Sequence, residues 1–375
     1  MDPKFIQRIQ DLSNAAGASG FEKPVSNLIQ QEWKSFGKSL IDKMNNVYLL
    51  RNKNSQTMDG PVSPLTTDLP EEASGRKLRL QLDAHLDEVG FVVQAILPNG
   101  TLRILPLGGM VSHNFAAQKV RVHIDEETSL PGIIASKPPH FLSAEEKKQG
   151  ISMENLIVDI GASSAEEARR LGVSLCLPVL PDVTCTFDES RALFMGKAFD
   201  CRSGCASLLE TMIRLDQKDL AVDVFGTLSA QEEVGERGAV VTANRVRPDL
   251  AIVFEGCPAD DTFSTPSGPQ TVLRKGPMLR HLDTSMITHT GFQHYALRLA
   301  KKLGIPAQEA VRSGGGTDGG IIHTSAMGVP TIVIGIPVRY IHAPIGFSTC
   351  EDHENAVRLA CAIIENMNRE KYDRL

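Results

Sequence analysis

Apolar stretches alternate with segments of helical period through the C-terminal half of the chain. The stretches VDVFGTLSA, DLAIVFEG and VPTIVIGI are rich in β-branched and aromatic residues and have the length of single strands. Around them, apolar residues recur at helical spacing in SGCASLLETMIRL, HTGFQHYALRLAKKLG and ENAVRLACAIIENMNREK. This alternation predicts an α/β domain, because each helix can cover one face of a sheet formed by the strands.

The N-terminal region adds helices and a strand to this domain. Apolar residues near helical spacing predict helices over residues 4–15 and 23–36. The polar stretch 52–77 is rich in Pro, Ser, Thr and Gly and is typical of a long surface loop. Leucine then alternates with Lys, Arg and Gln over residues 77–82, which predicts a strand that runs into DAHLDEVGF.

Residues 89–189 differ from the rest of the chain in their sequence pattern. Short β-like runs such as FVVQAIL, KVRVHI and GIIAS are broken by Gly, Pro and Asn, and the region closes with a strand and a short helix in ENLIVDIGASSAEEARRLGV. The chain therefore divides into a discontinuous α/β domain, residues 1–88 and 190–375, and an inserted β-rich domain, residues 89–189. A length of 375 residues fits two domains.

Composition excludes several classes of function. The net charge is −6 and no block of like charges occurs, so the basic face that nucleic-acid binding needs is missing. No apolar run reaches about 20 residues, and the N-terminus lacks the apolar centre of a signal peptide, so we expect no membrane span and no export. Seven cysteines without paired spacing argue against a disulfide framework and favour the reducing cytoplasm.

Residue types that bind metals follow several of the predicted strands. In open α/β sheets, sites gather outside the carboxyl ends of the strands, so these segments are expected to meet at one edge of the sheet. They are DAHLDEVG (83–90), KAFDCRSG (197–204), SAQEEVGERGA (229–239), VFEGCPADD (253–261) and PVRYIHAP (337–344).

The first segment contains His85 and Asp87 in an H-x-D pattern. Residues two apart on an extended backbone point to the same side, so Asp87 can hold one imidazole nitrogen of His85 and leave the other for a metal. A lone histidine after a strand is more often structural, and it is the aspartate two residues later that favours the metal site.

The third segment contains the acidic pair Glu232 and Glu233, which directly follows an apolar strand. An acidic pair is often only a solvated surface feature, but carboxylates at a buried strand end need a compensating positive charge, which a cation supplies. Adjacent side chains diverge, so one carboxylate can bind metal while the other faces a water molecule, a division of labour that suits metal-assisted hydrolysis.

Asp200, Glu255 and His342 complete the candidate set. Taken singly, Asp200 could be a helix N-cap, Glu255 an ion-paired surface residue and His342 a satisfied loop histidine. Jointly, two histidines and three carboxylates suit two Zn²⁺, Co²⁺ or Mn²⁺ ions, with one carboxylate as a bridge. The remaining eight histidines are expected to be structural.

The segment RSGGGTDGGIIH, residues 312–323, is rich in glycine and opens a predicted helix. It lacks the phosphate-loop pattern, and a plain tight turn is one alternative. Because glycines let the backbone approach a ligand closely, we expect a wall of the substrate cleft here, formed by Gly315 and Gly316 with Thr317 and Asp318 as polar contacts.

In ordered motifs along nearly its whole length, the chain resembles the tetrahedral (TET) aminopeptidases, dinuclear metallopeptidases that include glutamyl aminopeptidases. The motifs are AHLDEVGF, IGASSAEEA, GKAFDCRSG, QEEVGERGA, SGGGTDGG and VPTIVIGIPVRYIHA. The resemblance implies an αβα mixed-sheet sandwich of the zinc-exopeptidase type with an inserted, small β-barrel-like dimerisation domain. It also implies dimers that assemble into a dodecamer, and peptides as substrates.

The resemblance also implies a role for each candidate residue. His85 and Glu255 bind one metal, Glu233 and His342 bind the other, and Asp200 bridges them. Glu232 is the general base and Asp87 orients His85. Two positions depart from the family pattern: Glu255 replaces a more common aspartate, and Cys201 places a thiol beside the bridging residue, where oxidation is a risk.

These assignments predict two-metal hydrolysis of the first peptide bond, with Zn²⁺ preferred over Co²⁺ or Mn²⁺. A related dinuclear carboxypeptidase, dipeptidase or N-deacylase is the nearest alternative, because it could share the same ligand pattern. A glycosidase built on Glu232 and Glu233 fits poorly, since its two carboxylates must face each other across a sugar. A non-enzymatic, metal-stabilised assembly protein is a further alternative, but it needs no general base, so Glu232 would then have no role.

Overall fold

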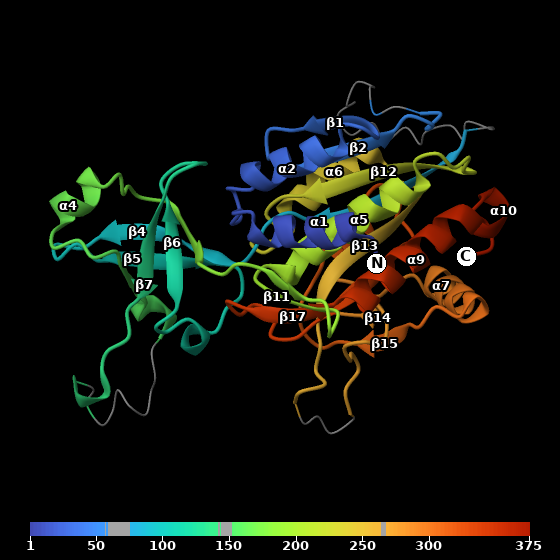
Figure 1. Ribbon diagram of the computed structural model, residues 1–375. Coiled ribbons are helices and arrows are strands. Elements are labelled where there is room, and N and C mark those ends of the chain that lie inside the picture. The colour runs from blue at the N-terminus through green and yellow to red at the C-terminus, as the bar shows by residue number, and fades with distance from the viewer. Residues whose placement is uncertain (57, 59–75, 142, 144–151, 264–267) are drawn as a thin grey trace.

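The computed structural model describes residues 1–375 except 57, 59–75, 142, 144–151 and 264–267. Figure 1 shows a larger layered α/β part and a smaller β part that stands beside it. The predicted surface loop at 52–77 lies mostly outside the described residues. The α/β sandwich with an inserted barrel, which the sequence predicted, is confirmed.

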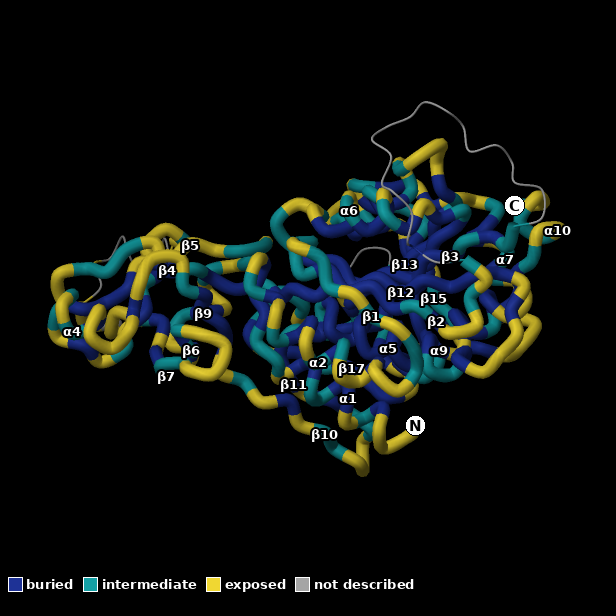
Figure 2. The backbone as a smooth tube through the Cα atoms, turned by 90° about the horizontal axis from the view of Figure 1, so that it is seen from above, coloured by how far each residue is buried: buried dark blue, intermediate teal, exposed yellow. Residues whose placement is uncertain are grey.

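Within the described residues, eight strands form the central sheet. In spatial order they are β1 (Gly37–Ile41), β2 (Val47–Arg51), β12 (Val222–Ser229), β3 (Leu78–His85), β13 (Leu250–Pro258), β16 (Thr331–Val338), β14 (Met278–Leu282) and β15 (Gln308–Val311). The central strands β12, β3, β13 and β16 run parallel, whereas β2 and β14 pair antiparallel with this group. The central strands are buried along their length (Figure 2), as their apolar sequences require.

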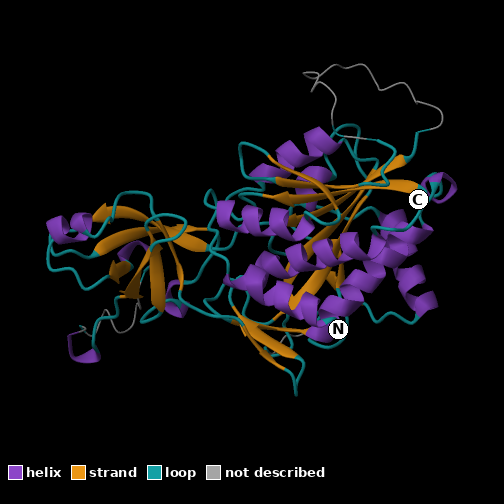
Figure 3. Cartoon of the chain, turned by 45° about the horizontal axis from the view of Figure 1, so that its top comes forward, coloured by secondary structure: helices purple, strands orange, loops and turns teal. Residues whose placement is uncertain are grey.

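Helices cover both faces of the sheet (Figure 3). On one face, α5 (Phe199–Leu215) packs on the central strands and is flanked by α1 (Pro3–Asn14) and α9 (Cys350–Asn366), with α7 (Thr290–Leu303) beside α9. On the other face, α6 (Arg237–Val246) and the short α8 (Gly319–Ile322) pack against β12, β13 and β16. The remaining helices of this part are α2 (Lys23–Trp33) and α10 (Arg369–Tyr372).

The helix boundaries follow local chemistry. Helix α1 begins at Pro3 because the Asp2 side chain accepts a hydrogen bond from the amide of Lys4 at 2.9 Å. Helix α2 ends at Trp33, three residues before the predicted end, and the chain enters β1 at Gly37. No helix in the described part of the chain is long and apolar enough to cross a membrane.

Six of the described strands close into a barrel in the order β4-β5-β8-β7-β6-β9. They are β4 (Gly90–Ile96), β5 (Leu102–Leu107), β6 (Lys119–His123), β7 (Ser129–Ile134), β8 (Ile157–Asp159) and β9 (Pro178–Pro181), with α4 (Ala165–Arg170) and three short 3-10 turns (Ser112–Asn114, Pro139–Phe141 and Met153–Asn155) between them. The barrel has its own apolar core, in which Phe91 and Phe115 meet edge to face at 5.2 Å. The division at residues 89 and 189 and the role in dimerisation stay predictions.

A small sheet of β10 (Thr186–Asp188), β11 (Leu193–Gly196) and β17 (Gly346–Thr349) lies where the chain returns from the barrel. Strand β11 leads directly into α5, and β17 leads directly into α9. Because the barrel begins five residues after His85 and β11 ends at Gly196, shortly before Asp200, both connections to the barrel adjoin the candidate metal ligands.

Candidate metal centre

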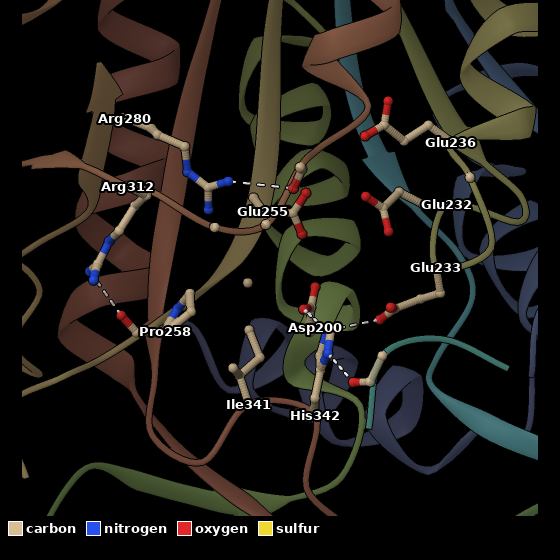
Figure 4. Close-up of a pocket in the computed structure, with 16 residues that line it drawn as sticks. Asp200, Glu232, Glu233, Glu236, Glu255, Pro258, Arg280, Arg312, Ile341 and His342 are labelled. Carbon is tan, nitrogen blue, oxygen red and sulfur yellow. Dashed lines mark hydrogen bonds and ion pairs between the residues drawn. The ribbon is translucent and has the colours of Figure 1, made fainter. Parts of the chain in front are cut away.

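The carboxyl ends of the parallel strands bring the candidate residues together. His85 is the last residue of β3 and pairs in register with Ser229, the last residue of β12, and the acidic pair follows Ser229. Glu255 lies near the end of β13, and His342 follows β16. Asp200 enters from the start of α5. Figure 4 shows Asp200, His342, Glu232, Glu233 and Glu255 facing one cavity.

Asp200 lies between the two histidines and directs one carboxylate oxygen to each. Its Oδ1 is 3.0 Å from Nε2 of His85, and its Oδ2 is 3.1 Å from Nε2 of His342. Glu255 Oε1 is 3.3 Å from the same His85 nitrogen, and Glu233 Oε1 is 3.3 Å from the same His342 nitrogen. The ligand atoms therefore form two triads that share Asp200, one with His85 and Glu255 and the other with His342 and Glu233.

The spacing within each triad fits a metal ion. Ligand atoms that bind one tetrahedral Zn²⁺ at about 2.0–2.1 Å are about 3.3 Å apart, and each histidine nitrogen lies 3.0–3.3 Å from the two carboxylate oxygens of its triad. Within the described residues, Glu233 Oε1 and both carboxylate oxygens of Glu255 are buried without a hydrogen-bond donor of good geometry. Buried carboxylate oxygens in that condition are stabilised by a cation, so the residues present fit a metal centre.

The imidazoles and Asp200 shift each other's pKa. Burial lowers the pKa of His85, but the Glu232 and Glu255 carboxylates outweigh it and raise that pKa well above its usual value. Burial also opposes the shift at His342, where the hydrogen bond to Asp200 and the close Glu233 carboxylate raise the pKa to about 11. Burial raises the pKa of Asp200, yet its contacts with both histidines hold it well below the usual range.

The pKa values of the three glutamates are raised, in contrast to that of Asp200. Burial raises the pKa of Glu255 to about 8, with Asp200 adding repulsion. Burial raises the pKa of Glu232 well above its usual value, and the charges of Glu255 and Glu233 add to that rise. The pKa of Glu233 is raised by burial as well. Ionising all these carboxylates in one buried cluster therefore requires nearby positive charge.

Asp87 has more partners than the predicted contact with His85. It is fully buried, and its Oδ1 lies 3.4 Å from Nδ1 of His85. The same carboxylate accepts hydrogen bonds from the main-chain amides of Glu232 at 2.9 Å and Glu233 at 3.2 Å, and from the Ser19 hydroxyl at 2.6 Å. Asp87 thus connects the histidine ligand to the backbone of the acidic pair, which the H-x-D pattern alone does not indicate.

The ligands open onto a cavity of about 490 Å³. Gly315 and Gly316, which were predicted to form a wall of the substrate cleft, line this cavity together with Gly314. Thr317 and Asp318 are placed differently from the prediction: their exposed fractions are 0% and 1%, and neither lines the cavity. Asp318 instead lies behind the loop beside Asp83, where burial raises its pKa well above the usual value.

Three charged residues of the cavity were not singled out from the sequence. Arg280 and Arg312 lie on one wall near Pro258, and Glu236 lies on the opposite side, above Glu232 (Figure 4). Arg280 donates to Asp283 at 3.0 Å, and Arg312 donates to Asp260 at 3.0 Å. An arginine inside the apolar strand β14 is the one sequence signal that could have indicated Arg280.

Cys201 lies beside the first triad but is not accessible. Its exposed fraction is 0%, and its thiol donates to the carbonyl of Phe254 at 3.3 Å. Burial, with the Glu255 charge, raises the pKa of the thiol well above its usual value, which disfavours the reactive thiolate. The predicted sensitivity to oxidation is therefore not supported. All seven cysteines are free, and Cys176 alone is exposed among them.

Comparison with known proteins gives concordant matches. A sequence profile of the M42 glutamyl aminopeptidase family matches residues 69–359. The glutamyl aminopeptidase of Lactococcus lactis subsp. cremoris (strain MG1363) is 29% identical over 370 residues, which cover 98% of each chain. These matches extend over both the layered α/β part and the barrel.

Solved structures share the whole architecture. The TET aminopeptidase from the marine sediment archaeon Thaumarchaeota archaeon SCGC AB-539-E09 has a TM-score of 0.88 and 34% identity, and the match covers 99% of each chain. The TET1 peptidase of Pyrococcus horikoshii, which can assemble into a tetrahedron or a large octahedral shell, has a TM-score of 0.82 and 26% identity. That second match covers 97% of this chain and 100% of the other.

Proposed function

Because the chain belongs to the M42 glutamyl aminopeptidase family and is a metal-dependent aminopeptidase, we propose that each subunit holds two divalent metal ions in the two triads around Asp200. His85 and Glu255 bind one ion, His342 and Glu233 bind the other, and Asp200 bridges them. The observation that carries this proposal is the carboxylate of Asp200, whose two oxygens each face a different histidine nitrogen. Nitrogen and carboxylate ligands favour Zn²⁺, with Co²⁺ or Mn²⁺ as alternatives.

Glu232 is proposed as the general base. It lines the cavity, is not a member of either triad, and has its Oε2 3.9 Å from Nε2 of His85. Bound divalent ions would polarise the scissile carbonyl and lower the pKa of a nearby water molecule. Glu232 then accepts the proton of that water as the water attacks the carbonyl carbon, and passes it to the nitrogen of the leaving amine. Asp87 and its contacts hold Glu232 in place through the main chain.

We further propose that the first residue of the preferred peptide is acidic. Two guanidinium groups, those of Arg280 and Arg312, lie on the cavity wall across from Glu232. Arg280 donates to Asp283 and the Gly316 carbonyl, and Arg312 donates to Asp260, the Pro258 carbonyl and the Thr271 hydroxyl. Each arginine has five N–H donors, so both keep donors for a substrate carboxylate. The glutamyl aminopeptidase of Lactococcus lactis, which acts on the same class of residue by its name, is consistent with this preference.

We also propose assembly into homo-oligomers in the cytoplasm. The TET1 peptidase of Pyrococcus horikoshii forms large shells, and its structure matches this chain over nearly its whole length. In this proposal the barrel is the dimerisation domain and dimers assemble into a dodecamer. Exposed apolar side chains on the barrel, including Leu105, Ile133 and Leu175, are candidates for that contact. Seven free cysteines favour a reducing compartment.

The decisive experiment replaces the base and leaves the ligands intact. Glu232→Gln is expected to retain two metal equivalents by mass spectrometry while losing most turnover of an aminoacyl-anilide. The N-acetylated anilide serves as the control substrate, because an aminopeptidase requires a free amino group. Full activity in Glu232→Gln would overturn the assignment of the base. Loss of a metal equivalent would instead show that Glu232 is a ligand.

A further inference from the structure

Four successive main-chain amides hold the acidic pair, and each donates to a side-chain oxygen from elsewhere in the chain. We call residues 230–233 the catalytic turn. The pairs are Ala230 N to Asn46 Oδ1 (2.7 Å), Gln231 N to Glu22 Oε1 (3.2 Å), Glu232 N to Asp87 Oδ1 (2.9 Å) and Glu233 N to Asp87 Oδ2 (3.2 Å). The turn lies beyond the end of β12, where the sheet no longer supplies acceptors, so side chains replace the missing strand partner.

The N-terminal region supplies most of this support. Glu22 has an exposed fraction of 0%, and its carboxylate also accepts from the amide of Gly20 at 2.6 Å and from the side chain of Asn45 at 3.2 Å. Ser19 donates its hydroxyl to Asp87 at 2.6 Å. The loop that carries Ser19 and Glu22 therefore contacts the catalytic turn both directly and through Asp87.

The geometry of the turn explains why it needs such support. Gln231 has a φ of +58°, in the left-handed region that residues other than glycine seldom adopt. This conformation reverses the chain immediately before Glu232 and Glu233. The carbonyl of Gln231 accepts from the amide of Arg237 at 3.2 Å, and its amide also needs an acceptor if the left-handed conformation is to be held at both ends of the residue. The acceptor is the Glu22 carboxylate.

The chemistry of Glu22 is unusual for a residue with a purely structural role. Burial, with the nearby Asp87 charge, raises the pKa of Glu22 to about 7. Among the described residues, no lysine, arginine or histidine forms an ion pair with it. Burying a carboxylate in that setting destabilises the fold. Its hydrogen bonds to three donors offset part of that cost.

We propose that Glu22 is a positioning residue for catalysis, which acts as a hydrogen-bond acceptor that fixes the catalytic turn and thereby orients Glu232 and Glu233. Asn46 likewise accepts from the amide of Ala230, and Ser19 donates its hydroxyl to Asp87, which in turn holds Glu232 and Glu233. The N-terminal loop is then part of the active site although none of these residues lines the cavity. This inference rests on the proposed roles of Glu232 as base and Glu233 as ligand.

The test compares Glu22→Ala with Glu22→Gln in the full-length protein. The alanine variant removes the acceptor, whereas glutamine keeps an acceptor oxygen and removes the charge. Ser26→Ala is the matched control, because Ser26 is buried on helix α2, which directly follows Glu22, and donates to the Asn45 carbonyl at 2.8 Å without touching the catalytic turn. Zn²⁺ affinity is measured by chelator competition, kcat and KM with an aminoacyl-anilide, and folding by thermal unfolding.

Glu22→Ala is expected to lower kcat about 10- to 100-fold with little change in KM, and to weaken one of two Zn²⁺ equivalents by a similar factor, as residues that orient ligands do. Glu22→Gln is expected to restore both values to within about threefold. Ser26→Ala should lower the unfolding temperature without changing kcat or Zn²⁺ affinity.

Two results would overturn the proposal. One is a Glu22→Ala variant with unchanged kcat and Zn²⁺ affinity; the other is a Glu22→Gln variant that loses as much as alanine does, which would assign the effect to charge. If Glu22→Ala does not fold, Ser19→Ala removes a single donor to Asp87 and is expected to lower kcat about tenfold; unchanged kcat there would count against the proposal. Wild-type metal content and the Glu232→Gln variant report separately on the proposed function.

Discussion

His353 gives the fold a quantifiable sensitivity to acid. Its side chain is fully buried between α5 and β17, with Nδ1 3.4 Å from the Ser207 hydroxyl and Nε2 3.2 Å from the Ser348 hydroxyl. Phe5 and Phe194 contact the ring edge to face at 6.2 and 5.8 Å. Burial in this apolar and neutral setting lowers the pKa of His353 to about 3. The folded protein therefore keeps the ring uncharged.

The sign and size of the effect follow from this shift. Histidine in the unfolded chain has a pKa of about 6.5, so between about pH 6.5 and pH 3 the unfolded state binds more protons than the folded state. The free energy of unfolding therefore rises with pH in that window, and this contribution is lost as pH falls below about 6.5. At about 1.4 kcal/mol per pH unit, His353 alone destabilises the fold by about 2 kcal/mol on going from pH 7 to pH 5.

Urea unfolding of the wild type and of His353→Gln at pH 7 and pH 5 measures this quantity. Glutamine bonds both serines without titrating, so the wild type is expected to lose about 2 kcal/mol more than the variant over the two units. Loss of metal at low pH affects both proteins alike and cancels in the difference. Equal losses in the two proteins would refute the argument and show that His353 stays neutral on unfolding or is charged when folded.

Two further predictions concern the site. His342→Ala is expected to lose one metal equivalent by mass spectrometry and keep the other, because the His85 triad is untouched; two tightly bound equivalents would contradict its role as a ligand. Arg280→Met is expected to lower kcat/KM for a glutamyl-anilide about 10- to 100-fold, the value of a hydrogen bond to a charged group, while an alanyl-anilide changes little. Equal losses with both substrates would mean that Arg280 supports the cavity without selecting the residue.

The sequence predicted the ligands because their information is local. His85 ends β3, Glu255 lies near the end of β13, and Glu233 and His342 follow β12 and β16; parallel strands end at one edge of a sheet. The same reasoning predicted an α/β domain, since strand and helix periods differ clearly in the C-terminal half, whereas the αβα sandwich was implied by the family resemblance. Strand–helix alternation therefore indicates both the fold class and the edge of the sheet at which the candidate metal ligands gather.

What the sequence could not indicate depends on contacts between distant segments. The acceptors of the catalytic turn come from Glu22 and Asn46, about two hundred residues away, and no local period marks them. Thr317 and Asp318 show the converse case, in which a local pattern indicated a ligand contact that the structure does not have. A polar pair beside glycines is typical of a ligand contact, yet the helix that begins at Gly319 turns both side chains into the interior.

Charge balance links the base to the metal ions. Four carboxylates, those of Asp200, Glu232, Glu233 and Glu255, converge on two imidazoles in a buried cluster. Ionised, they carry four negative charges, which two divalent ions balance when both imidazoles are neutral ligands. Without such cations, burial and the neighbouring carboxylates raise the pKa of Glu232 well above its usual value, and a protonated Glu232 accepts no proton. Since one divalent ion leaves two of the four negative charges unbalanced, loss of either ion is expected to favour protonation of Glu232 and so to impair the base as well as the ligand set.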